Sequence, residues 1–214
     1  MRRLALLALL LPLAACGGDS AGALSQATFG AGCAAGGACV GGLDAPLAAG
    51  ARLPLVVDLQ IPGTATPPMT LRSVSPEVFS IEGTVAAAHA PGVAALLLVG
   101  PDGLVLDFLH LWVADAEGLA LNRRSAEGNV LGALSPELPL FPGDEVLFSV
   151  EAVAGGQELL GGFDVAVTGA GPAVSVVHAG GARWFRIRAL SPGEATLAVD
   201  GLGHRATVHV EVLP

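Results

Sequence analysis

Short runs of alternating residues, separated by turn-forming residues, constrain the fold of this chain most strongly. Within residues 53–59 a large aliphatic side chain recurs at every second position, which is the period of a strand with one buried face. Similar runs follow, and turns such as Pro101-Asp102-Gly103 separate them, because proline fixes φ and glycine tolerates a positive φ. Short strands with this spacing are typical of β-sandwiches. We therefore expect an all-β chain.

The expected strands fall into two groups on either side of a more polar stretch at residues 114–136. The first group covers residues 53–59, 69–74, 78–81, 85–88, 93–99 and 104–113. The second group covers residues 145–153, 158–168, 173–178, 182–190, 194–199 and 204–212. The 30 glycines and 15 prolines among the 214 residues favour many turns over long helices. We place the domain junction in the polar stretch.

The N-terminal segment has the three parts of a secretory signal. Arg2 and Arg3 precede an apolar run at residues 4–11, and Leu13-Ala14-Ala15-Cys16 closes the segment. The run is too short for the ~20 residues that cross a bilayer as a helix. The ending resembles the lipobox of bacterial lipoproteins. This resemblance implies that residues 1–15 are removed and that Cys16 is acylated, so that the protein is held to a membrane of the cell envelope, at the outer membrane or cell surface.

Residues 16–42 are rich in glycine, alanine and serine and show no sustained period, so we interpret them as a flexible tether. Once Cys16 carries lipid, Cys33 and Cys39 remain as one pair. An oxidising compartment favours a disulfide between them, and so short a loop adds only about 2 kcal/mol of stability. Two free thiols in a disordered tether are the alternative. Two cysteines with no nearby histidine do not make a metal site.

Charge and motif content exclude several functions. Without Arg2 and Arg3 the chain has eight basic and nineteen acidic residues, a net charge of −11, which repels nucleic acid. The sequence contains no nucleophile elbow, Walker loop, His-Glu-x-x-His or calcium loop. The carboxylates are scattered, and the only adjacent pair is Asp144-Glu145. We therefore predict no catalytic residue, no metal and no cofactor.

The two halves of the chain are related as a divergent repeat. Residues 88–99 and 189–199 share an alanine followed by Pro-Gly-x-Ala-x-Leu and a closing valine. Upstream, residues 47–50 match residues 140–143, each ending in glycine before an expected strand. Such a repeat predicts two domains of the same architecture. The equivalent positions should then be two Pro-Gly turns and two buried leucines: Pro91-Gly92 and Pro192-Gly193, Leu96 and Leu197.

We assign residues 43–121 to the first domain and residues 122–214 to the second. Ser75-Pro76-Glu77-Val78, followed by Gly83-Thr84-Val85 and Ala90-Pro91-Gly92-Val93-Ala94, is similar to the motif order of bacterial immunoglobulin-like domains of group 2. The second half keeps Ser191-Pro192-Gly193-Glu194-Ala195 and the closing strand, but lacks the Ser-x-Pro-x-Val motif. The resemblance implies two tandem Ig-like β-sandwiches in a stalk, adhesin or surface-binding module, with no fixed catalytic site.

These features together predict a lipid-anchored, non-catalytic envelope protein. It would bind a polysaccharide or protein partner, or act as a spacer, and contact the membrane through Cys16. The alternative is a β-sandwich hydrolase acting on carbohydrates. That alternative requires carboxylates that converge in a concave pocket.

The candidate ligand-binding residues are Trp184, Arg186 and Arg188. As a strand, residues 183–188 direct these three side chains to the face opposite Phe185 and Ile187. In one interpretation the indole covers the sheet edge and the arginine stems pack flat with their heads in water. In the other, the three side chains bind an anionic polysaccharide or an acidic protein surface, because indoles stack on sugar rings and guanidinium groups pair with carboxylates.

Overall fold

The computed structural model describes residues 26–32, 42–60, 67–180 and 183–214. Within these ranges the regular elements are all strands, which confirms the all-β prediction. The described residues include no helix that could cross a membrane. The predictions for the signal peptide, Cys16, Cys33 and Cys39 lie outside the described ranges.

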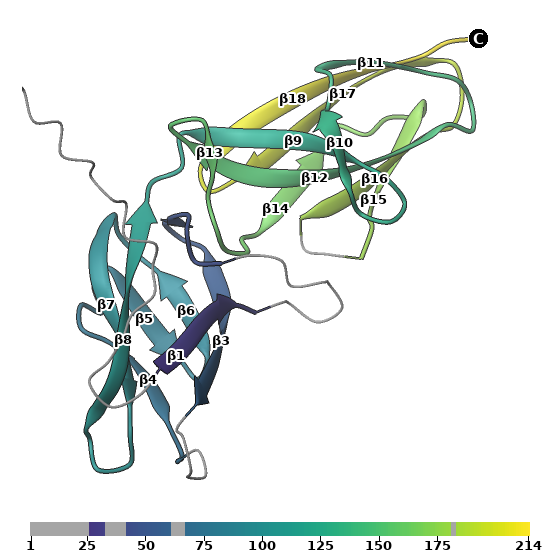
Figure 1. Ribbon diagram of the computed structural model, residues 1–214. Coiled ribbons are helices and arrows are strands. Elements are labelled where there is room, and N and C mark those ends of the chain that lie inside the picture. Colours follow the sequence, from purple (N-terminus) through teal and green to yellow (C-terminus); the bar gives the residue numbers. More distant parts are fainter. Residues whose placement is uncertain (1–25, 33–41, 61–66, 181–182) are drawn as a thin grey trace, which may run out of the picture.

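The first sandwich consists of two four-stranded sheets (Figure 1). One sheet has the order β1-β3-β6-β5, with β1 at Gln26–Ala31, β3 at Arg52–Gln60, β6 at Val85–Ala88 and β5 at Phe79–Glu82. The other has the order β2-β8-β7-β4, with β2 at Leu47–Ala48, β8 at Val105–Ala114, β7 at Gly92–Val99 and β4 at Thr70–Ser73.

The second sandwich repeats this arrangement. Its larger sheet has the order β10-β9-β12-β16-β15, with β10 at Val130–Ala133, β9 at Gly118–Arg124, β12 at Glu145–Ala154, β16 at Trp184–Ala189 and β15 at Val174–His178. The short β13 (Gln157–Glu158) pairs with β12. Its other sheet has the order β11-β18-β17-β14, with β11 at Glu137–Leu140, β18 at His204–Val212, β17 at Gly193–Gly201 and β14 at Val165–Thr168.

Both sandwiches have immunoglobulin topology. When β10 and β13 are set aside and the other strands are lettered in chain order, each sandwich packs a sheet A-B-E-D against a sheet A′-G-F-C. This is the arrangement of constant-type immunoglobulin domains. The short A′ strand pairs in parallel with the last strand in both halves, as β2 with β8 and β11 with β18. The two halves therefore share strand order, direction and pairing.

The repeat extends to individual hydrogen bonds. The Gly50 N–H donates to Ala88 O at 3.0 Å, and the Gly143 N–H donates to Ala189 O at the same distance. Gly92 and Gly193 open equivalent strands with φ of 157° and 145°. The two equivalent leucines, Leu96 and Leu197, are both fully buried. Alternation along the strands builds each core, and the second contains stacked Phe148 and Phe185 rings 5.6 Å apart.

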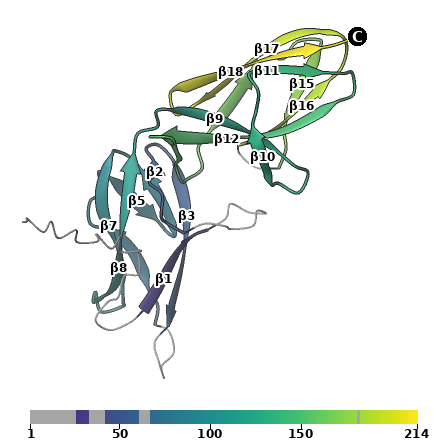
Figure 2. The ribbon, with the colours of Figure 1, turned by 45° about the horizontal axis from the view of Figure 1, so that its top comes forward.

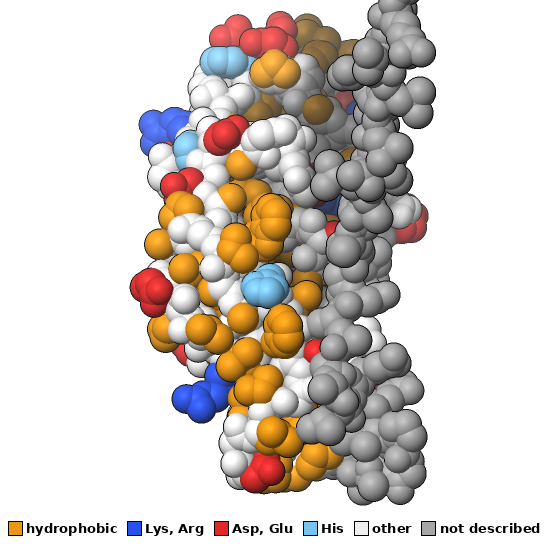
Figure 3. Space-filling model, turned by 60° about the vertical axis from the view of Figure 1, so that its left-hand side comes forward, with side chains coloured by type: hydrophobic (Ala, Val, Ile, Leu, Met, Phe, Trp, Pro, Cys, Tyr) orange, Lys and Arg blue, Asp and Glu red, His pale blue; other side chains and the backbone are white. Residues whose placement is uncertain are grey.

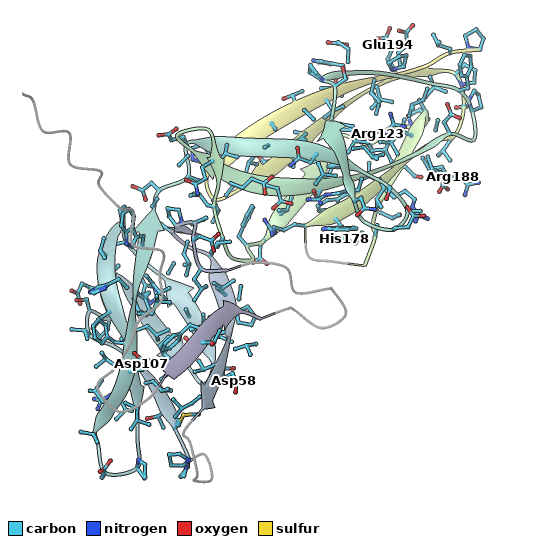
Figure 4. All side chains as sticks on the ribbon, viewed as in Figure 1. Asp58, Asp107, Arg123, His178, Arg188 and Glu194 are labelled. Carbon is cyan, nitrogen blue, oxygen red and sulfur yellow. The ribbon has the colours of Figure 1, made fainter. Side chains whose placement is uncertain are left out.

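The flexible tether expected at residues 16–42 contains a strand, which corrects that expectation for residues 26–31. Residues 26–31 are strand β1, which pairs with β3 from Gln26 to Ala31. The buried carboxylate of Asp107 in β8 also holds β1, because the Ala27 N–H donates to Asp107 Oδ2 at 2.9 Å; Figure 4 labels Asp107. Phe29 is the only large apolar residue of β1. A strand this poor in apolar side chains shows no period in the sequence.

The passage between the two sandwiches lies at the start of the polar stretch at residues 114–136. β9 already belongs to the second sandwich, where it pairs with β12 from Gly118 to Arg124. The chain therefore passes from one sandwich to the other between Ala114 and Gly118, earlier than the expected boundary at residues 121 and 122. The expected strand at 158–168 is also interrupted, because its middle part contacts the first sandwich.

Backbone hydrogen bonds join the two sandwiches. The Ala48 N–H donates to Leu160 O at 3.0 Å, and the Leu160 N–H donates to Pro46 O at 2.8 Å. Arg52 and Gly162 exchange two further bonds of 2.8 and 2.7 Å. We refer to residues 46–52 and 160–162 as the joint. The sandwiches follow one another in an elongated, bent arrangement (Figures 1 and 2).

Side chains at the joint also merge the two cores. Ala48 and Ala51 of the first sandwich are fully buried and belong to the core of the second. Leu160 of the second sandwich packs against the core of the first. Gly161 has φ of +103°, and a Cβ at this position would lie 2.8 Å from the Ala51 Cβ. The joint therefore requires glycine, and its backbone pairing favours a fixed angle between the sandwiches.

Candidate functional site

Trp184, Arg186 and Arg188 lie on the outer face of β16. Phe185 and Ile187 are buried between them, so the strand alternates as expected. Arg186 and Arg188 are exposed, whereas Trp184 is half-buried. Figure 4 shows Arg188 extending from the second sandwich.

The indole of Trp184 is covered in part by the β9–β10 turn. A Cβ placed on Gly128 in this turn would lie 2.7 Å from Trp184 Cη2, and Gly128 has φ of +92°. The Arg124 guanidinium lies 5.3 Å from the centre of the indole ring, within cation–π distance. Trp184 thus contributes to packing and still exposes part of its ring.

The two exposed arginines share one carboxylate. Arg186 Nη1 lies 3.5 Å from Glu145 Oε2, and Arg188 Nε lies 3.7 Å from Glu145 Oε1. The three side chains are between 43% and 60% exposed. Ion pairs of this kind are worth less than about 1 kcal/mol. Both guanidinium groups can therefore exchange Glu145 for an anionic ligand at little cost.

A second pair of arginines holds a buried carboxylate on the same face. Glu151 is only 8% exposed, and Arg124 Nη2 donates to its Oε1 at 3.0 Å. Arg183 Nη1 donates to Glu151 Oε2. Arg124 Nε also donates to Ser149 Oγ at 2.7 Å. Both oxygens of the Glu151 carboxylate thus accept a hydrogen bond from an arginine, which holds Arg124 and Arg183 beside Trp184.

A groove of about 350 Å³ lies between the two sandwiches beside this cluster. The Trp184 side chain lines this groove. The first sandwich contributes Arg52, Leu53 and Pro54, and the second contributes Glu151, Arg183 and Trp184. The groove therefore combines an indole, two guanidinium groups and apolar walls.

A smaller hollow of about 290 Å³ lies on the outer face of β11, β17 and β18. His209 lines this hollow, and its Nδ1 is 3.1 Å from Thr196 Oγ1. Three exposed glutamates surround it: Glu137, Glu194, which Figure 4 labels, and Glu211. No group of side chains in the described residues could hold a metal ion. The hollow lies on an exposed sheet face, unlike the water-excluding sites in which general acids work.

Three carboxyl groups have a lowered pKa, so each is stabilised in its charged form. A hydrogen bond of 2.5 Å from Arg52 lowers the pKa of Glu82, and one of 2.7 Å from Arg205 lowers the pKa of Asp200. A hydrogen bond from Ser125 lowers the pKa of Glu127. A general acid at neutral pH requires a shift in the opposite direction. These three groups therefore act as structural anions.

A second exposed surface, on β8 of the first sandwich, lies outside the predicted site. Phe108, His110 and Trp112 occupy alternate positions of β8 and point outward, with Trp112 60% and Phe108 42% exposed. The Phe108 and His110 rings meet edge to face, with centres 5.6 Å apart. The signal was present, because three ring-bearing residues recur with period two in residues 104–113. The period that predicts this strand also places the three rings on one of its faces.

Comparisons with known proteins found distant structural similarity. No family model matches the chain, and no curated protein matches its sequence. Domains 4 and 5 of the S-layer protein SbsC are 13% identical with a TM-score of 0.36, covering 92% of this chain and all of that one. The Escherichia coli adhesin FdeC is 9% identical, with a TM-score of 0.36, covering 92% of this chain and 65% of that one. The Yersinia pseudotuberculosis adhesin InvE is 11% identical, with a TM-score of 0.35, covering 92% and 61%. Similarity at this level does not assign a function.

Proposed function

We propose that this chain is a lipid-anchored, non-catalytic protein of the cell envelope, in which two joined Ig-like sandwiches form a binding or spacer module. The observation that carries the proposal is the joint, where four backbone hydrogen bonds and shared core residues connect the sandwiches. Mobile linkers between domains lack such pairing. A spacer needs a fixed joint because it must keep its far end at a defined distance and direction.

The position of Cys16 determines which sandwich is nearer to the membrane. Nine residues lie between Cys16 and Gln26 at the start of β1, and the ten Cα–Cα steps from Cys16 to Gln26 span at most about 35 Å. An acylated Cys16 therefore keeps the first sandwich close to the bilayer surface. The second sandwich, with the groove and Trp184, projects beyond it.

The proposed ligand-binding surface is the outer face that carries Trp184, Arg186 and Arg188. Arg124 and Arg183 lie on the same face, where Glu145 and Glu151 are the carboxylates paired with arginines. The resulting local charge is positive on a protein of net charge −9. An anionic polysaccharide or an acidic protein surface fits this face, with affinity that decreases as salt screens the charges.

The anchor is tested by replacing Cys16 with alanine in a cell that processes bacterial lipoproteins. The protein should then move from the membrane fraction to the soluble fraction, because the acyl chains supply the membrane affinity. Cys33→Ala is the matched control and should remain with the membranes. If the Cys16→Ala protein also remains with the membranes, Cys16 is not the anchor.

The ligand surface is tested on a polygalacturonate column, with neutral dextran as the uncharged comparison. Retention on polygalacturonate should fall when Trp184 and Arg186 are both changed to alanine. Arg205→Ala, which removes an exposed arginine from the β17–β18 hairpin, should leave retention unchanged. Equal losses in both variants would indicate non-specific ion exchange in place of a binding face.

A further inference from the structure

The outer face of β7 and β8 in the first sandwich is apolar and exposed. Phe108, His110 and Trp112 on β8 lie beside Leu97, Ala95 and Val93 on β7 in direct cross-strand pairs. Trp112 is 60%, Val93 55% and Phe108 42% exposed. We refer to these six residues as the aromatic face. Figure 3 shows this side of the molecule, where hydrophobic side chains gather over the lower sandwich and most carboxylates lie toward the periphery.

The second sandwich provides an internal comparison for the aromatic face. β17 and β18 pair in the same register as β7 and β8, with Gly193 opposite Val212 as Gly92 is opposite Val113. The positions equivalent to Val93, Ala95, Phe108, His110 and Trp112 are therefore Glu194, Thr196, Thr207, His209 and Glu211. The same fold thus tolerates carboxylates and hydroxyls at these positions. Folding alone does not explain the apolar residues of the first sandwich.

We propose that the aromatic face binds a second copy of this chain, so that the protein forms a two-fold symmetric dimer. The residues along β8 have the order Phe108-Leu109-His110-Leu111-Trp112. This order is symmetric about His110, with a ring on either side at the same distance. A two-fold axis that lies in the interface beside His110 and runs perpendicular to β8 places Phe108 of one copy against Trp112 of the other, twice. Such self-complementarity is the requirement of an isologous interface.

The charge of the face suits this partner, and its rings supply part of the apolar area that a dimer interface needs. At their observed exposures, Trp112 and Phe108 together present on the order of 200 Å², and the aliphatic neighbours add to this area. A standard interface buries about 800 Å² per partner, just over half of it apolar. Among the outward residues described on β4, β7 and β8, the charged one is Arg72, and none is a carboxylate. Two acidic chains can therefore approach here without opposing carboxylates.

Sedimentation equilibrium of the lipid-free chain tests the proposal independently of the anchor. The chain from residue 16 onward, carrying Cys16→Ser and kept in reductant, should show a reversible monomer–dimer equilibrium. Trp112→Glu introduces the residue type of the equivalent position and should raise the dissociation constant at least about tenfold. His110→Arg should do the same, because it places like charges opposite each other at the axis. The matched control His209→Arg, at the equivalent position of the second sandwich, should leave the dimer intact.

A cross-link tests the position of the axis. In a chain with Cys16, Cys33 and Cys39 changed to serine, His110→Cys should form an intermolecular disulfide on oxidation, since a residue on a two-fold axis faces itself. His209→Cys should form no intermolecular disulfide under the same conditions, because this position lies outside the proposed interface. The proposal is overturned if the unmodified chain stays monomeric, or if Trp112→Glu and His110→Arg both leave the dimer intact. It is also overturned if the face binds phosphatidylcholine vesicles through Trp112 while the chain stays monomeric.

Discussion

Two glutamates of β12 allow a direct comparison of buried and exposed ion pairs. Glu151 and Glu145 lie six residues apart on the same face of the strand, and each contacts two arginines. The side chain of Glu151 is 8% exposed, whereas that of Glu145 is 43% exposed. The arginines beside Glu151 are 14% and 24% exposed. The same substitution, glutamate to glutamine, therefore tests burial with little else changed.

We expect Glu151→Gln to lower the free energy of unfolding by about 3 kcal/mol. The change removes the charge that compensates Arg124 and Arg183, and leaving a buried charge without its partner costs about 3–5 kcal/mol. Glutamine retains one acceptor oxygen, which places the estimate at the lower end. Glu145→Gln removes exposed pairs and should cost less than about 1 kcal/mol.

The measurement is urea unfolding of both variants, followed by far-UV circular dichroism. The midpoint should shift clearly for Glu151→Gln and hardly at all for Glu145→Gln, with the denaturant slope unchanged. Raising the salt concentration should reduce the loss of unfolding free energy in Glu145→Gln by a larger fraction than the loss in Glu151→Gln, because salt screens exposed charges more than buried ones. Equal losses in the two variants would refute the reasoning, because burial would then not determine the strength of these pairs.

Three further outcomes follow from the structure. Gly161→Val should loosen the joint, since its Cβ meets Ala51 and valine disfavours φ of +103°; faster amide exchange at Leu160 would show this, and unchanged exchange would contradict it. Arg52→Gln should raise the pKa of Glu82 toward its usual range, because the hydrogen bond that lowers it is lost; an NMR titration of the carboxyl group measures the shift, and an unchanged pKa would contradict it. The stability that the Arg52–Glu82 ion pair contributes should be present at pH values above the usual pKa of glutamate. It should disappear as the pH falls through the lowered pKa of Glu82. Cys33→Ala should leave the melting temperature nearly unchanged, and a fall of many degrees would mean that this segment packs on the first sandwich.

The strongly alternating strands could be predicted from the sequence, whereas the polar and very short ones could not. β3, β7, β12 and β18 carry apolar residues at every second position, and their bounds lie close to those expected. β9 was missed because it ends in polar residues, and two of these, Asn122 and Arg124, face outward and bond to neighbouring strands. Asn122 donates to Glu158, and Arg124 donates to Ser149 and Glu151.

The sequence could predict which side chains of β16 face outward, but not which residues form ion pairs with its arginines. The sequence of residues 183–188 is sufficient to assign Trp184, Arg186 and Arg188 to one face. Glu145, which pairs with Arg186 and Arg188, lies more than 40 residues earlier in the chain. Only the pairing of β12 with β16 brings them together. Likewise, nothing in the sequence indicates that the segment after β13 contacts the first sandwich.

The most direct test of the proposed envelope function is the mass of the N-terminal peptide of the protein purified from membranes of a cell that makes bacterial lipoproteins. The account predicts a peptide that begins at Cys16 and carries the added mass of acyl chains on that cysteine. A peptide that begins at any other residue, or an unmodified Cys16, would contradict it.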